Sequence, residues 1–75
     1  MRTKFKLYFL KNKEGQGIYN CQGNLYYLNM NKLDSLFEVT SFDSKKDIIE
    51  FAKKRKIEYD SIGTIEFFVK ELKPC

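Results

Sequence analysis

The sequence contains no histidine, one proline and two cysteines. Histidine is the side chain whose ordinary pKa lies closest to neutral pH, so its absence removes the usual catalytic triads and dyads. Cys21 has no histidine to act as its base, and two widely separated cysteines do not form a zinc cluster. The sequence also lacks a P-loop and a dinucleotide-binding fingerprint. We therefore expect a protein that is not an enzyme and that holds no metal and no cofactor.

The low cysteine count also bears on the cellular compartment. Small secreted domains are usually rich in disulfide bonds. Here a single bond between Cys21 and Cys75 is one alternative, and two reduced thiols are the other. No apolar run reaches the roughly 20 residues that span a bilayer, and lysines interrupt the apolar part of residues 1–13, unlike a signal peptide. These features predict a cytoplasmic protein without membrane association.

Nothing in the sequence divides the chain. It has no repeats and no Pro/Gly/Ser-rich linker, and its one proline, Pro74, lies next to the end. Hydrophobic residues make up 43% of the chain and aromatic residues 16%, which is typical of a folded domain. We expect one compact domain over residues 1–75. The abundance of Lys, Asn, Phe, Ile and Tyr suggests an AT-rich coding background, such as a low-GC bacterium or its phage.

Alternating apolar and polar residues predict most of the strands. Residues 3–11 have this period of two, with Phe5, Leu7 and Phe9 on one face. Residues 18–22 and 25–30 are expected to pair through a two-residue turn at 23–24. Residues 64–72 form the last predicted strand, and three of its residues are expected to face the core. These are Ile65, Phe67 and Val69.

Residues 36–40 are interpreted as a further short strand, with a helical turn over residues 33–37 as the alternative. The following segment has helical spacing instead. Asp43 or Ser44 is expected to cap a helix that ends near residues 54–56, and Asp47 lies three residues after Ser44, as in a capping box. The apolar stripe of this helix consists of Ile48, Ile49, Phe51 and Ala52.

Together these elements predict an α+β fold. We expect a single-layer, mostly antiparallel sheet of four to five strands packed by one helix, in the order β-β-β-(β)-α-β. The first and last strands are the longest and are expected to lie centrally. The helix stripe is expected to contact one face of these two strands, namely Phe5, Leu7, Phe9, Ile65, Phe67 and Val69.

The excess positive charge lies in one segment. Residues 45–56 hold six basic and two acidic residues, and 6 − 2 = +4 equals the net charge of the whole chain. Such a localised charge favours an anionic partner. The candidate surface consists of Lys45, Lys46, Lys53, Lys54, Arg55 and Lys56. Glu50 stands four residues from both Lys46 and Lys54, so part of this charge is expected to be compensated.

A second candidate surface is the polar face of the first strand. Interleaved lysine and tyrosine on a sheet suits stacking against nucleic-acid bases. This surface comprises Lys4, Lys6, Tyr8, Tyr19 and Tyr27, with Tyr26 as the alternative to Tyr27. The glycines of residues 12–17 are interpreted as part of a loop between strands and not as a phosphate site, because no helix follows them.

Two functions are consistent with these features. The first is a small non-enzymatic protein-binding module, such as a phage or mobile-element accessory protein that docks on and modulates a host macromolecule. Aromatic residues dominate the buried centres of such interfaces. The alternative is nucleic-acid binding through the basic helix and the Lys/Tyr sheet face. A homodimer formed through an edge strand also remains open.

Overall fold

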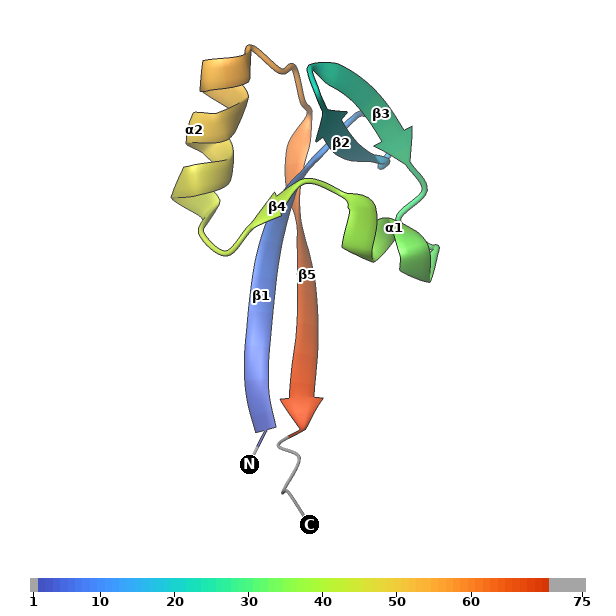
Figure 1. Cartoon of the computed structure of the whole chain (residues 1–75), viewed down its shortest axis with the longest axis vertical. Coiled ribbons are helices and arrows are strands. Elements are labelled where there is room, and N and C mark those ends of the chain that lie inside the picture. The colour runs from blue at the N-terminus through green and yellow to red at the C-terminus, as the bar shows by residue number, and fades with distance from the viewer. Residues whose placement is uncertain (1, 71–75) are drawn as a thin grey trace.

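The computed structural model describes the backbone of residues 2–70 and the side chains of residues 5–66 (Figure 1). An antiparallel five-stranded sheet carries two helices, which confirms the predicted α+β class. In chain order the elements are β1 (Arg2–Lys11), β2 (Gly17–Cys21), β3 (Asn24–Leu28), α1 (Leu33–Glu38), β4 (Ser41–Phe42), α2 (Lys45–Arg55) and β5 (Ser61–Lys70).

β1 and β5 form a long antiparallel ribbon that projects beyond the rest of the molecule (Figure 1). The two strands pair without interruption from Arg2↔Lys70 to Lys11↔Ser61. On its other edge β1 pairs with β4 at Tyr8 and Phe9 and with β2 at Lys11. β1 is therefore central, as predicted. β5 has β1 as its only partner among the described strands, so the prediction of a central last strand is wrong.

The β2–β3 hairpin turns at Gln22 and Gly23, one residue earlier than predicted. Both residues have positive φ, 52° and 85°, and Cys21 pairs with Asn24. A two-residue turn with positive φ at both positions matches the right-handed twist of the flanking strands. Glycine at the second position removes the steric cost of this conformation.

α1 occupies the segment interpreted as a short strand, so the alternative of a helical turn is correct. Asp34 lies in its first turn, where a negative charge suits the helix dipole. The N–H of Val39 closes the last turn on the carbonyl of Ser35. The predicted strand is displaced to β4, directly after α1.

α2 begins and ends where the sequence predicts. Ser44 is its N-cap residue, but no side-chain hydrogen bond caps the helix, so the capping box is not formed. Lys56 ends the helix in the left-handed conformation, with φ of 55°. The N–H of Ile57 then bonds the carbonyl of Ala52 at 2.9 Å, which satisfies one of the free carbonyls of the last turn.

The apolar stripe of α2 packs into the core as expected. Ile48 is 0% exposed and Ala52 2% exposed, and Ile49 and Phe51 pack at the margin of the same cluster. The rest of the buried cluster consists of Leu10, Ile18 and Ile57. Tyr8, Phe42 and Ile62 pack against it from the sheet.

However, the apolar stripe of α2 covers one face of β1, and the prediction placed it on the other face. Residues paired across β1 and β5 share a face, so Leu7 and Ile65 lie together, away from Leu10 and Ile62. The predicted contacts with Phe5, Leu7, Phe9 and Ile65 are therefore wrong. Phe67 and Val69 share that face by register, and their side chains lie outside the described residues.

The width of the sheet explains this choice of face. Among the described strands, β1 has neighbours on both sides only from Tyr8 to Lys11, so only this part can support a helix. There Leu10 and Ile18 offer an apolar surface to α2. On the other face Phe9 is buried across Gly63, where an added Cβ would overlap the Phe9 ring.

The core packing predicts that Ile48→Ala destabilises the protein by about 2–5 kcal/mol, because truncation leaves a cavity in a fully buried site. Urea denaturation would measure the change in the free energy of unfolding. Phe37→Ala, at a residue that is 81% exposed, is the matched control and should change it by less than about 0.5 kcal/mol. Equal effects of the two substitutions would contradict the packing.

Candidate functional site

An apolar groove lies between α1 and the β1–β5 ribbon, on the face opposite α2. Leu7 and Ile65 form its floor, and they stand opposite each other in the strand register. α1 supplies one wall through Leu33, Leu36 and Phe37, and Ser41 and Glu66 complete the lining. The groove has a volume of about 330 Å³. We call this set of residues the apolar groove.

Much of the apolar surface around the groove is open to solvent. Leu33 is 68% exposed, Phe37 81%, and Phe5 at the next position of the same ribbon face 44%. A clustered apolar surface of this kind marks an interaction site far more often than a scattered one does. Sequence reasoning missed it because residues 36–40 were interpreted as a strand, although Leu33, Leu36 and Phe37 have helical spacing.

The edge of β1 beside the groove lacks a strand partner among the described residues. β4 and β2 pair with β1 only from Tyr8 onward, so no described strand lies beside this edge at residues 2–7, and we call this stretch the open edge. On the face opposite the groove, Lys6 is exposed, forms a 3.8 Å salt bridge with Glu66 and lies 5.5 Å from the centre of the Tyr8 ring. This edge of β1 therefore has an apolar face and a basic face, with no described strand beside it.

The six basic residues at 45–56 are all exposed, as the inward orientation of the stripe requires. Arg55 lies 5.8 Å from the centre of the Phe51 ring. Between the described residues, neither Lys46 nor Lys54 makes an ion pair with Glu50, so the expected charge compensation by direct contact does not form. The charges stay available to a ligand.

The structure does not bring the predicted Lys/Tyr sheet face together. Tyr8 is half-buried beneath α2, and Lys6 lies beyond the end of the helix-covered area. Tyr27 stands opposite Ile18 on the α2 side of the sheet, whereas Tyr19 stands opposite Tyr26 on the other side. Lys4 takes the register position opposite Phe68, and its side chain lies outside the described residues.

Tyr19 and Tyr26 form a local aromatic contact with ring centres 5.8 Å apart. A hydrogen bond between the side chains of Tyr19 and Cys21 favours the neutral phenol and raises the pKa of Tyr19 above its usual value of 10.0. Cys21 carries a free thiol. The alternative of a Cys21–Cys75 bond is therefore not formed at Cys21. Cys75 itself lies outside the described residues.

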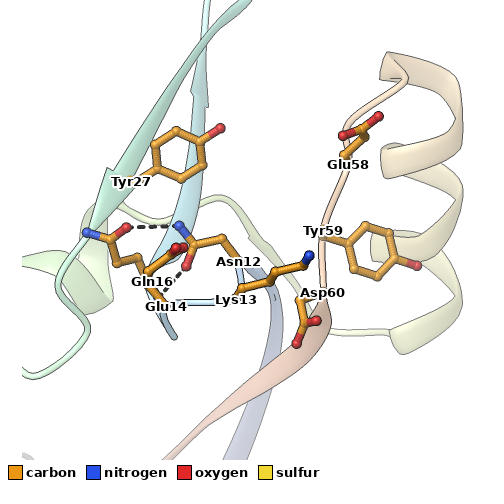
Figure 2. Close-up of a pocket in the computed structure, with 8 residues that line it drawn as sticks. All are labelled: Asn12, Lys13, Glu14, Gln16, Tyr27, Glu58, Tyr59 and Asp60. Atoms are coloured by element: carbon orange, nitrogen blue, oxygen red, sulfur yellow. Dashed lines mark hydrogen bonds between the residues drawn. The ribbon is translucent and has the colours of Figure 1, made fainter.

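A polar cleft of about 510 Å³ lies between the loop at residues 12–16 and residues 58–60 (Figure 2). Two hydrogen bonds that involve side chains brace the loop: Asn12 Nδ2 donates to Gln16 Oε1 at 2.9 Å, and the Gln16 N–H donates to Asn12 Oδ1 at 2.8 Å. Three carboxylates and one ammonium line the cleft, from Glu14, Glu58, Asp60 and Lys13.

This cleft does not suit an anion, because its acidic side chains outnumber the basic one. The predicted loop without a phosphate site is consistent with that charge. Within the part of the chain that the structure describes, no three acidic or thiol side chains lie close enough to hold a metal ion. Tyr27 and Tyr59 lie on opposite sides of the cleft, as Figure 2 shows.

No family model, curated protein or solved structure matches this chain. Among the described residues, neither helix has the length and apolar character needed to cross a membrane.

Removing the thiol should lower the pKa of Tyr19. In Cys21→Ala the phenol loses its hydrogen bond, so its pKa should fall toward 10.0. Because the folded state favours the neutral phenol, Tyr19 contributes to the stability of the fold at pH values below its unfolded-state pKa. This contribution disappears as the pH rises through the folded-state pKa. An NMR titration of ring-labelled tyrosines would follow Tyr19 in the variant and in the unmodified protein. An unchanged Tyr19 titration would show that the hydrogen bond is not the cause.

Proposed function

We propose that this protein is a small non-enzymatic protein-binding module whose ligand is an extended segment of a partner protein. The segment pairs with the open edge of β1 and places alternate side chains against the apolar groove. The observation that carries this proposal is the position of the open edge, at residues 2–7, beside an exposed apolar surface that includes Leu33 and Phe37.

The backbone of the open edge supports strand addition. Unpaired N–H and C=O groups at a sheet edge are a template for another strand. In this mode of recognition the main-chain hydrogen bonds supply affinity, and pockets for alternate side chains supply specificity. The groove lies on the face that receives every second side chain of an added strand.

The two faces of the edge define the chemistry of the segment. Phe5 and Leu7 lie on the groove face, so the residues of the bound segment that face them should be apolar. Lys6 is exposed on the opposite face, where it also contacts Glu66 at 3.8 Å, and in the sequence Arg2 and Lys4 precede it with the same period of two. A complementary segment therefore alternates apolar residues with aspartate or glutamate.

A second copy of the chain is a poor ligand for this edge. Two β1 edges that pair about a two-fold axis at Lys4 place Arg2 opposite Lys6. A two-fold axis at Phe5 places Lys4 opposite Lys6. Like charges directly opposite each other destabilise a strand pair, so these basic residues disfavour homodimerisation through β1.

A ten-residue peptide of alternating valine and glutamate should bind at least tenfold more tightly than two controls. One control has the same composition in two blocks, and the other replaces glutamate by lysine. Amide chemical shifts of the ¹⁵N-labelled protein would report affinity and position, with the largest changes expected at Lys6 and Leu7. Equal affinity for all three peptides, or no binding of any, would contradict the proposal.

Phe37→Ser should weaken binding of the alternating peptide about tenfold, because an aromatic contact surface is lost. Its effect on the free energy of unfolding should stay within about 0.5 kcal/mol, since the residue is already exposed. Tyr59→Ser removes an aromatic ring from the polar cleft and serves as the matched control. A similar loss of affinity in both variants would indicate that the groove is not the binding site.

A further inference from the structure

The charges of α2 are divided between the two ends of the helix. Lys45 and Lys46 lie in the first turn, and four basic residues, Lys53, Lys54, Arg55 and Lys56, follow from position 53. Asp47 and Glu50 lie between the two groups. Lys46 and Lys53 are seven helical steps apart, which is about 10 Å at a rise of 1.5 Å per residue.

The helix holds these two groups at a fixed separation. Ile48 and Ala52 lie between them and are buried in the core, so the helix axis is anchored on the sheet. All six basic residues are exposed, and none is in an ion pair with a described carboxylate. A ligand would meet two rigidly spaced centres of positive charge with negative charge between them.

We infer that α2 is a contact surface for double-stranded nucleic acid, with its two basic ends on the phosphates that border one groove. The major groove of B-form DNA is about 12 Å wide, close to the separation of the two charged groups. In this arrangement Asp47 and Glu50 lie over the groove, between the two phosphate backbones. The inference is independent of the proposed peptide binding.

The charge pattern favours a duplex over an anionic membrane. A bilayer spreads its negative charge evenly and would meet Asp47 and Glu50 as well as the lysines. Five of the six basic residues are lysine, which contacts phosphate as a point charge, whereas arginine is favoured for bidentate reading of guanine. We therefore expect binding without base-sequence preference.

The placement of α2 permits both ligands to bind together. α2 covers one face of β1 and the apolar groove lies on the other. A protein segment at the groove and a duplex at α2 would thus stand on opposite sides of one sheet. The protein would then join a partner protein to a nucleic-acid backbone.

Fluorescence anisotropy with a labelled 20-base-pair duplex between 50 and 200 mM salt tests this inference. The logarithm of the affinity should fall linearly with the logarithm of salt, with a slope of about −0.9 per neutralised phosphate. Lys53→Gln/Lys54→Gln and Lys45→Gln/Lys46→Gln should each make the slope shallower by about 1.8. Lys13→Gln/Lys32→Gln, which removes two exposed lysines elsewhere, should leave the slope unchanged.

Several results would overturn the inference. The first is the absence of duplex binding at 50 mM salt, and the second is tighter binding to phosphatidylserine vesicles than to the duplex. The inference would also fail if the Lys13/Lys32 control changed the salt slope as much as the α2 variants do. It would fail as well if substitutions at only one end of α2 changed the slope. Phe37→Ser should bind the duplex normally, and Lys53→Gln/Lys54→Gln should bind the alternating peptide normally. Failure of the duplex site and failure of the peptide site are therefore distinguishable.

Discussion

The packing of Ile48 against Leu10 and Ile18 is the contact on which the other features of the molecule depend. Ile48 is fully buried, and it joins α2 to the part of the sheet where β1 has neighbours on both sides. Because the apolar stripe of α2 faces inward, the basic residues of the helix must face solvent. Because α2 takes one face of β1, the other face is left to α1 and the apolar groove.

The β1–β5 ribbon extends beyond the area that the helices cover (Figure 1). A two-stranded ribbon is only marginally stable by itself in water, so its stability depends on the core at one end. Its far part keeps an exposed apolar side chain, Phe5, and an open β1 edge among the described strands. An added strand would extend the sheet there and bury part of this surface, which is the physical basis of the proposed partner binding at the ribbon.

Much of the fold could be predicted from the sequence, because local periodicity determines local structure. The alternation of residues 3–11 identifies β1, and the spacing of Ile48, Ile49 and Ala52 identifies α2. The face of β1 that α2 covers could not be predicted. Phe9 and Leu10 are adjacent and point to opposite faces, and both are buried. Periodicity alone gives no preference between them.

The two candidate surfaces differ in how far the sequence could predict them. The basic surface lies within residues 45–56, so the local charge of the sequence identifies it. Its side chains face solvent because the apolar stripe of α2 faces the core. The apolar groove joins Leu7, Phe37 and Ile65, which lie far apart along the chain. Only the tertiary arrangement brings them together. The predicted Lys/Tyr sheet face does not form for a similar reason. The register of the β2–β3 hairpin places Tyr19 and Tyr27 on opposite faces of the sheet.

The assignment of faces can be tested directly by nuclear Overhauser contacts in solution. A three-dimensional NOESY spectrum of the methyl- and aromatic-labelled protein would report which β1 side chains lie near Ile48. The structure predicts cross-peaks from the Ile48 methyl groups to Leu10 and Ile18, and none to Leu7 or Ile65. Cross-peaks from Ile48 to Leu7 and Ile65 would place α2 over the apolar groove and contradict both proposed surfaces.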